Sequence, residues 1–356
     1  MTGEVDYIIV GQGISGTWLS YFLAKEGMRL AVIDKADPSS ASRVAAGVIN
    51  PVTGRRHVTV WMAEEILPFA WQSYTNLGHE LNINAISQKT LLDFFPSSQM
   101  RESFLQRVEE KSPYLHTYPE QNHFNTHFQY DFGCGEIRPV YIAHLENILP
   151  AWRKELGSQG MLVEEEFEIS GLEVSGTGVR YGDIKAKKII FCDGIGGTEN
   201  PWFKALPFAP NKGETLVVEI PGLPDQHIYK KGMVLVPLEI PGHWWAGSTY
   251  AWEFENDEVT TGFREKTEQW LQSWIKIPFQ IKEQHAAIRP ATLERRPFVG
   301  LHPVNASIGI LNGMGTKGCS LAPYFAKQLS DLLVYNLPVA PEADIARFSK
   351  VLSREA

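Results

Sequence analysis

Three glycines near the N-terminus have the spacing that lets a chain hold a dinucleotide. The stretch GQGISG places Gly11, Gly13 and Gly16 after an apolar run, DYIIV, and before a helical pattern, TWLSYFLAKEG. The first glycine permits a tight turn, the second lets a pyrophosphate approach the backbone, and the third lets the helix pack closely on the strand. Free N–H groups at the helix N-terminus bind phosphates, so Ile14 and Ser15 are also candidate contacts.

An acidic residue completes this pattern. The second apolar run, LAVID, ends at Asp34, and Lys35 follows it as a further candidate contact. A carboxylate at the end of the second strand accepts the ribose hydroxyls, which favours FAD or NAD over NADP. A chance glycine turn is the alternative, but the strand, the helix and the acid are all present in order. The sequence therefore predicts a dinucleotide site.

The next segment favours FAD over NAD. Instead of further regular βα units, the chain enters an irregular stretch rich in small residues, PSSASRVAAGVINPVTGRR at 38–56. Small side chains on extended backbone suit close contact with a large flat cofactor. A surface loop is the alternative, although the run at 45–49 is apolar. The candidate cofactor contacts in this segment are Ser42, Arg43, Ala46 and Gly47.

Two later glycine-rich stretches are expected at the same cofactor. KKIIFCDGIGG, at 187–197, predicts a buried strand beside the first one, with Gly194 near the pyrophosphate or adenosine. ILNGMGTKGCSLAP, at 310–323, lies between a strand-like run and a helix-like run. A helix beginning near Leu321 would aim its positive end at the flavin. The candidate contacts in the second stretch are Gly313, Gly315, Thr316 and Lys317.

Composition excludes several classes of protein. The 356 residues carry a net charge of −8 and no basic stripe, so no nucleic-acid partner is expected. No apolar run reaches the roughly 18 residues of a membrane span, and no signal peptide is evident. The three cysteines lie far apart without a CxxC pair, and the histidines lack metal-ligand spacing. We therefore expect a cytoplasmic protein with neither a disulfide nor a metal site.

The order of these stretches predicts two interleaved domains in an α/β (α+β overall) fold. Residues 1–80, 135–203 and 286–356 would form a Rossmann-like FAD-binding domain. Residues 81–134 and 204–285 would form a discontinuous substrate domain, or cap, built on an antiparallel sheet over the flavin. Four alternating runs predict its strands, and TEQWLQSWI, at 267–275, predicts an amphipathic helix. The four runs are ETLVVEI, MVLVPLEI, HWWAGSTY and IKIPFQIKEQ.

Four stretches in this order resemble the flavin-dependent amine and amino-acid oxidase family, which includes D-amino-acid oxidase, glycine oxidase and sarcosine oxidase. They are the N-terminal motif up to Asp34, SSASRVAAG, AAIRPATLERRPFVGLHP and ILNGMGTKGCSLAP. The resemblance implies an FAD-dependent oxidoreductase that oxidises the C–N bond of a small amino acid or secondary amine by hydride transfer to flavin N5. Between Gln284 and His302 the chain lacks the cysteine that holds FAD covalently in some relatives, so noncovalent FAD is expected.

Two departures from the family pattern accompany the match. Position 34 is Asp where FAD-binding members more often carry Glu, and Cys192-Asp193 stands where relatives usually have small residues. The second departure weakens the detailed assignment around Asp193. It also lends some weight to a flavin-binding protein without catalysis.

The resemblance also suggests which residues handle substrate. Arg289, in AAIRPA, matches an arginine that holds the substrate carboxylate in the glycine-oxidase branch. Lys317, in GMGTK, matches a lysine of the sarcosine-oxidase branch in a GHGFK-like loop, with Met314 and Thr316 in place of His and Phe. We predict both as catalytic and substrate-binding residues, with Tyr250 in the pocket. The neighbouring Trp244 and Trp245 are further pocket candidates.

Each assignment has a structural alternative. Arg289 could pair with Glu294, Lys317 could serve only the flavin, and the three aromatics could be ordinary core residues. Arg55 and Arg56 are a third cationic candidate. A related enzyme acting on a tRNA-borne amine is a second possible function, against which the negative charge argues. The sequence leaves open the amine, its enantiomer, the electron acceptor and the oligomeric state.

Overall fold

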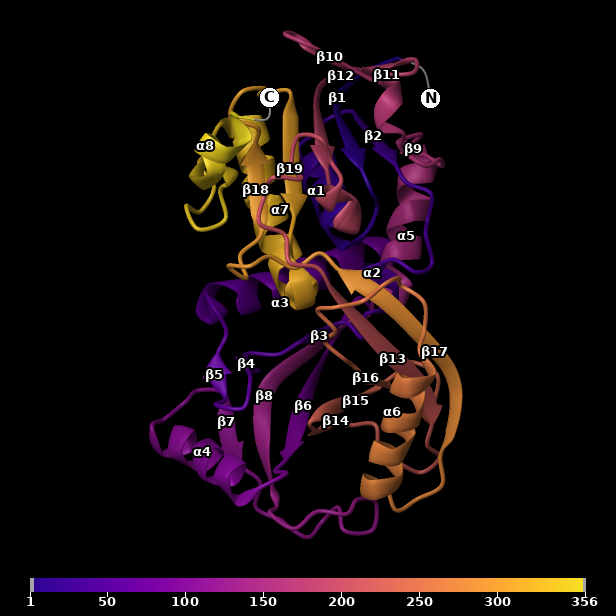
Figure 1. Cartoon of the computed structure of the whole chain (residues 1–356), viewed down its shortest axis with the longest axis vertical. Helices are drawn as coiled ribbons and strands as arrows, with labels where there is room; N and C mark the ends of the chain where they lie inside the picture. Colours follow the sequence, from indigo (N-terminus) through magenta and orange to yellow (C-terminus); the bar gives the residue numbers. More distant parts are fainter. Residues whose placement is uncertain (1–2, 355–356) are drawn as a thin grey trace.

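The computed structural model describes residues 3–354 and is built on two β-sheets, one above the other along the long axis of the molecule (Figure 1). The helix α2 (Ala41–Val44) lies near the junction of the two halves (Figure 1). A short hairpin, β4 (Val52–Thr53) with β5 (Val58–Thr59), lies level with the lower sheet, and Val52 packs in a core cluster with residues of that sheet. In the described residues no helix is both long enough and apolar enough to cross a membrane.

The upper sheet has a parallel centre in which the first strand lies between two partners. β1 pairs in parallel with β2 and with β12, so the prediction that the strand of KKIIFCDGIGG lies beside the first strand is confirmed. β19 continues the sheet in parallel beyond β12. The strands of this sheet are β10 (Leu172–Ser175), β11 (Gly178–Tyr181), β12 (Ile184–Phe191), β1 (Gly3–Val10), β2 (Leu30–Ile33), β9 (Leu162–Val163), β18 (Phe298–Leu301) and β19 (Ile308–Asn312).

Helices cover one face of the upper sheet. Ile9 and Val32 pack on that face in a core shared with α1 (Ile14–Lys25), α3 (Ala63–Leu81), α5 (Leu145–Ser158) and α7 (Gly318–Tyr335). Ile8 and Ala31, one residue away on each strand, point to the opposite core, which includes Phe203. Buried on both faces, these strands read as the continuous apolar runs found in the sequence.

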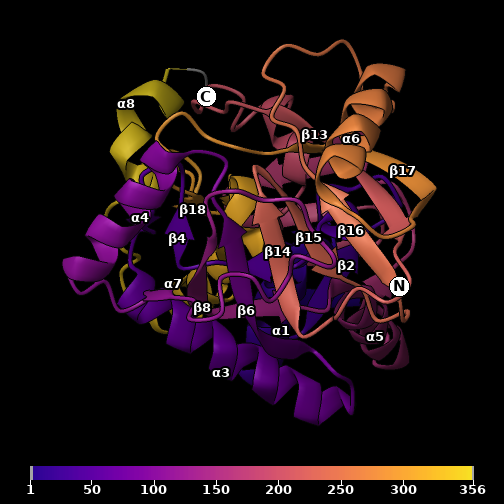
Figure 2. The same ribbon diagram turned by 90° about the horizontal axis from the view of Figure 1, so that it is seen from below.

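The lower sheet is antiparallel except for one parallel pair, β14 with β6. The four alternating runs fall on β13, β15, β16 and β17, and the amphipathic run lies in α6 (Thr261–Trp274). α6 contacts β13 near one end of the sheet and α4 (Ser98–Glu109) contacts β7 toward the other (Figure 2). The strands are β17 (Gln280–Arg289), β13 (Asn211–Glu219), β16 (His243–Gly247), β15 (Met233–Pro237), β14 (His227–Lys231), β6 (Ile86–Phe94), β8 (Cys134–Ala143), β3 (Val48–Ile49) and β7 (Leu115–Thr117).

Strand pairing departs from the predicted division of the chain at three places. β3 was assigned with 1–80 to the cofactor half, yet it pairs with β8 in the lower sheet. β8 was assigned with 135–203 to the cofactor half, yet it pairs with β6 in the lower sheet. The last residues of β17, assigned with 286–356, pair with β13 in the same sheet. The reason is that partners far apart in sequence decide which sheet a strand joins, and alternation within the strand carries no record of them. The two-domain division itself stays a prediction.

The C-terminal glycine-rich stretch follows β19 and turns through a short 3-10 segment, Gly315–Lys317, into α7. The helix begins at Gly318 rather than near Leu321. A short helix, α8 (Ser349–Leu352), lies near the end of the chain.

Candidate active site

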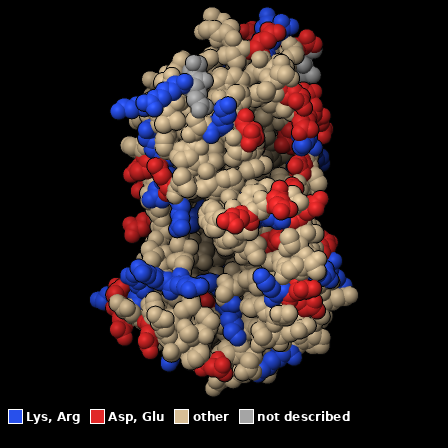
Figure 3. Space-filling model, in the orientation of Figure 1, with Lys and Arg blue, Asp and Glu red and all other residues tan. Residues whose placement is uncertain are grey.

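A cavity of about 1760 Å³ lies between the two sheets and opens on the face shown in Figure 3 as a hollow between the upper and lower halves. Pockets for one small ligand usually measure about 300–1,000 Å³. The cavity is therefore large enough for a dinucleotide together with a substrate. Basic side chains lie above and below the hollow on this face.

The glycines of GQGISG are at positions where the backbone comes close to its neighbours. Gly11 has a φ of 94°, and a Cβ there would meet the carbonyl oxygen of Cys192 at 2.6 Å. A Cβ on Gly16 would lie 1.8 Å from the carbonyl oxygen of Gly11. The helix α1 therefore begins directly against the turn, with its first N–H groups at the cavity. This cradle fits the phosphates of a dinucleotide.

The structure brings nearly all of the predicted cofactor contacts to this one cavity. Only Gly16 does not line it, because it packs under the turn where helix and strand meet. The predicted residues that do line it are Gly11, Gly13, Ile14, Ser15, Asp34, Lys35, Ser42, Arg43, Ala46, Gly47, Gly194, Gly313, Gly315, Thr316 and Lys317.

Asp34 lies at the cavity but has close protein partners. It accepts hydrogen bonds from the backbone N–H groups of Gln12, at 2.8 Å, and Ala36, at 2.7 Å. The guanidinium of Arg153 donates to the same carboxylate at 2.7 Å. A carboxylate has about four acceptor positions, so one remains for a ribose hydroxyl. Arg153 was not singled out in the sequence, because nothing local connects α5 with β2.

Asp193 explains one departure from the family pattern. Its carboxylate accepts hydrogen bonds from the amides of Asn312, at 2.8 Å, and Asn200, at 3.3 Å. The Asn312 amide also donates to the carbonyl of Gly194. Burial raises the pKa of Asp193 to about 6, against the opposing effect of these hydrogen bonds. Asp193 therefore ties the end of β12 to the end of β19 on the side of the cavity that the upper sheet forms.

Arg289 is a half-buried cation at the cavity, held by neutral groups. Its guanidinium donates to the side chains of Asn211 and Ser248, each at 2.7 Å, and to the carbonyl of Thr249 at 3.1 Å. Within residues 3–354 no carboxylate pairs with it; Glu294, the partner considered above, pairs with Arg347. Burial lowers the pKa of Arg289. Arginine nevertheless keeps its charge in proteins, so the site holds an uncompensated positive charge.

The position of Arg289 depends on its neighbours along the strands. A Cβ on Gly213 would lie 1.8 Å from the guanidinium, so only glycine leaves room there. The Tyr250 ring lies 4.9 Å from the guanidinium carbon and is 59% exposed at the cavity. Asn211, Gly213 and Ser248 were missed in the sequence, because their relation to Arg289 exists only once β13 pairs with β17 on one side and with β16 on the other.

Lys317 lines the same cavity beside two arginines. Burial, reinforced by Arg296 and Arg295, lowers the pKa of Lys317 to about 8. Arg296 stacks on the Trp61 ring at 4.0 Å. No ion pair connects any of these three cations with a carboxylate of the described residues. This part of the cavity therefore has a strong positive potential with no counter-charge from the chain.

Of the remaining pocket candidates, the two adjacent tryptophans lie on opposite faces of the lower sheet. Trp245 lines the cavity, and its indole N–H donates to the carbonyl of Val44 at 3.0 Å. Trp244 is fully buried on the opposite face under α6, so its prediction as a pocket residue was wrong. Successive strand residues point to opposite faces, and one of two adjacent tryptophans must therefore enter the core. Of the arginine pair, Arg55 lines the cavity and Arg56 does not.

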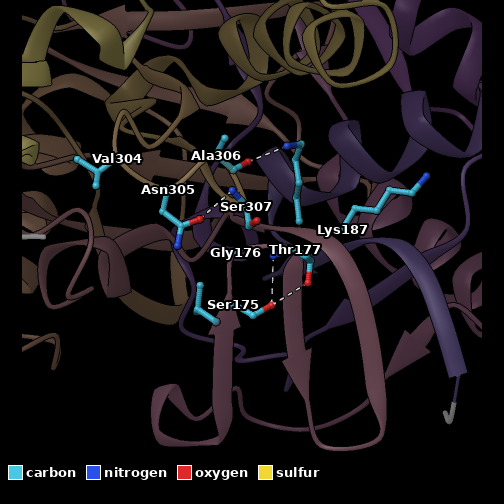
Figure 4. A pocket seen from close by; sticks show the side chains of 10 residues that line it. Ser175, Gly176, Thr177, Lys187, Val304, Asn305, Ala306 and Ser307 are labelled. Carbon is cyan, nitrogen blue, oxygen red and sulfur yellow. Dashed lines mark hydrogen bonds between the residues drawn. The ribbon is translucent and has the colours of Figure 1, made fainter.

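A second, smaller depression lies far from these residues, at the outer end of the upper sheet (Figure 4). It measures about 620 Å³ and is lined by polar groups such as Ser175, Thr177, Lys187 and Asn305. Its hydrogen bonds are a local turn bond from the Ser175 hydroxyl to the carbonyl of Gly178, at 3.0 Å, and a bond from the Lys188 ammonium to the carbonyl of Ala306, at 2.7 Å. The residues that line this depression include no carboxylate, histidine or cysteine.

The chain matches known proteins along most of its length. Residues 6–332 match the family described as DAO, FAD dependent oxidoreductase. The glycine oxidase of Pseudomonas aeruginosa is 22% identical over 367 residues, covering 95% of this chain and 97% of that protein. A local match of 39% identity over 75 residues to Uncharacterized oxidoreductase YurR of Bacillus subtilis covers only 20% of that protein and 21% of this chain.

The fold is also that of a solved relative. The structure of glycine oxidase from Geobacillus kaustophilus covers 98% of both chains with a TM-score of 0.79 and 19% identity. The glycine cradle, Asp34 and the size of the cavity fit FAD, and the family match spans both sheets. We conclude that this chain belongs to the family of FAD-dependent oxidoreductases.

Proposed function

We propose that the protein oxidises the C–N bond of a small amino acid or secondary amine that carries a carboxylate. The observation that supports this most is Arg289, a half-buried cation at the cofactor cavity that only neutral groups contact. Leaving a buried charge without a counter-charge is costly, so such a residue is expected to meet an anion during function. The names of the whole-length relatives, which are glycine oxidases, agree with a carboxylated amine.

The unused donors of Arg289 suit a carboxylate. A guanidinium has five N–H donors, and the three hydrogen bonds occupy both on Nη1 and one on Nη2. The Nε–H and the second Nη2–H remain, and together they form one edge of the guanidinium. That edge can bind both oxygens of a carboxylate with charge assistance.

FAD, when bound, supplies the acceptor for the hydride that leaves the carbon next to nitrogen. The chain supplies position and electrostatics. Arg289 fixes the carboxylate and thereby the adjacent carbon, and Lys317 adds positive charge near the loop that would contact the flavin. Trp245 and Val236 form an apolar wall that keeps water away from the reacting carbon. Burial raises the pKa of Cys319 to about 12, which supports noncovalent binding, because the thiol stays protonated.

Anaerobic mixing with a panel of substrates tests this function directly. Glycine, D- and L-amino acids and N-methylamino acids should be added to the yellow protein, and at least one should bleach the oxidised flavin band. Methylamine and N-methylalkylamines, which lack the carboxylate, serve as controls and should reduce it far more slowly. If no amine reduces the flavin, a binding protein without catalysis becomes the better description.

The lowered pKa of Lys317 predicts how carboxylate affinity depends on pH. Lys317 is charged below about pH 8 and neutral above it, so the binding of a carboxylate should weaken as the pH rises through 8. Loss of one charge-assisted interaction corresponds to roughly a ten-fold increase in Kd. The measurement is the titration of acetate against the flavin absorbance of the protein between pH 6.5 and 9.5. Acetate has no amine of its own to titrate.

Two variants show whether the pH dependence of acetate binding comes from the charge of Lys317 or from another group. Lys317→Met should bind acetate weakly and with no step near pH 8. Lys317→Arg should keep tight binding above pH 8, because the guanidinium stays protonated. An unchanged step in Lys317→Met would show that another group is responsible.

A further inference from the structure

Charged side chains are distributed unevenly around the cavity. The acidic residues that line the cavity, apart from Asp257, lie at the ends of β2 and β12 and in the segment after β9. This is the side of the cavity where the adenosine of FAD would bind. These acidic residues are Asp34, Asp37, Glu165, Glu166, Glu168, Asp193 and Glu199. The basic lining residues are Lys35, Arg43, Arg55, Lys230, Arg289, Arg295, Arg296 and Lys317, and of these Lys35 pairs with Glu166 on the acidic side. Much of this positive charge lies beyond what one substrate carboxylate requires.

The inner face of the lower sheet connects two of these cations. Arg289 lies at the end of β17, and Lys230 lies on β14, four strands away in the order of the sheet. Four interstrand steps correspond to roughly 19 Å. Between them the lining is largely apolar, with Val234 and Val236 of β15 and Trp245 of β16 on the same face. The cavity thus has an apolar floor with a cation at each end.

Arg55 reaches the far end of this floor from a turn that is firmly anchored. The turn joins β4 to β5, and its last residue, His57, inserts into the lower sheet, where it is 2% exposed. The imidazole lies 3.1 Å from the carboxylate of Asp93, and Lys230 donates to the same oxygen at 2.8 Å. Asp93 is 1% exposed. This buried cluster fixes His57, two residues along the turn from the exposed Arg55, beside Lys230.

Other groups at the far end are also suited to an anion. Ser97, Gln99 and Met100, at the start of α4, line the cavity there. Ser97 caps this 12-residue helix, accepting a hydrogen bond from the N–H of Met100 at 3.3 Å. The N-terminal end of a helix carries a partial positive charge. Within residues 3–354 no carboxylate pairs with Arg55, so its charge is free for a ligand.

We propose that Arg55 and Lys230 form a second anion subsite, and that the substrate carries a terminal carboxylate or phosphate joined by an apolar chain to its amino-acid end. This inference rests on the proposed function, in which Arg289 holds the first carboxylate. It makes the substrate a doubly anionic amine rather than glycine itself. Arg55 is then a specificity-determining residue.

The subsite can be tested before the substrate is known. The experiment compares the binding of dicarboxylates and monocarboxylates of equal length to the FAD-loaded protein. Linear dicarboxylates from glutarate to dodecanedioate are titrated against flavin absorbance, each beside the monocarboxylate of equal length. Above a threshold length the dicarboxylate should bind about ten-fold more tightly, the effect of one charge-assisted contact. Phosphonocarboxylates of the same lengths show whether the subsite prefers a phosphate-like group.

Variants in the turn between β4 and β5 show whether Arg55 causes the tighter binding of the dicarboxylate. Arg55→Gln should bring the ratio of the two Kd values toward one, and Arg55→Lys should restore part of it. The matched control is Arg56→Gln, since Arg56 is exposed on the same turn and outside the cavity, and it should keep the wild-type ratio. A ratio near one at every length, or a preference that survives in Arg55→Gln, would overturn the subsite. If amines do not reduce the flavin and neither acid series perturbs it, the proposed function fails as well.

Discussion

Replacing Arg289 by glutamine is expected to lower kcat/KM for a carboxylated amine by about a hundred- to ten-thousand-fold. Two charge-assisted hydrogen bonds to the carboxylate would be lost, each worth roughly 1.5–3 kcal/mol. Each 1.36 kcal/mol of lost transition-state binding lowers the rate about ten-fold. The measurement is the rate of anaerobic flavin reduction as a function of substrate concentration, for the best substrate of the panel.

Two comparisons make this result specific to the carboxylate. Arg289→Lys keeps the charge but not the two-donor edge, so it should recover only part of the lost rate. A matched amine without a carboxylate should lose much less when Arg289 is replaced. Flavin absorbance per protein should remain, because Arg289 is held by Asn211, Ser248 and Thr249 rather than by the phosphate cradle. If the variant instead purifies without flavin, Arg289 serves the cofactor.

Replacing Gly16 by alanine is expected to remove most of the bound FAD. The new Cβ would lie 1.8 Å from the carbonyl oxygen of Gly11, so either α1 or the turn must move. Either shift displaces the N–H groups that would meet the pyrophosphate. Overpacking of this kind usually costs about 1–3 kcal/mol of folding free energy. The measurements are the ratio of flavin to protein absorbance after gel filtration and the Tm of the variant.

A matched glycine controls for the substitution itself. Gly157 lies in α5, and a Cβ there would meet nothing within 4 Å. Gly157→Ala should therefore keep its FAD and gain up to about 1 kcal/mol of stability from helix propensity. Full flavin content in Gly16→Ala would show that the close approach of α1 to the turn is not needed for cofactor binding.

Several features of the fold were predictable because they are local. Gly11 and Gly13 predict a turn, because adjacent residues set its backbone geometry. Asp34 then follows at the end of the next strand. The C-terminal loop around Lys317 was predictable for the same reason. The central strands were evident because parallel strands with both faces buried form continuous apolar runs.

The sequence by itself thus determined the family and the cofactor, and it singled out glycines and an aspartate that line one cavity in the structure. Only the tertiary structure decided that β8 and β17 belong to the lower sheet, and that Trp245 faces the cavity while Trp244 enters the core. It also decided that Arg289 contacts Asn211 and Ser248, and that Asp93 bonds both His57 and Lys230. These contacts link residues far apart in the chain, and strand pairing creates them, so no local pattern records them.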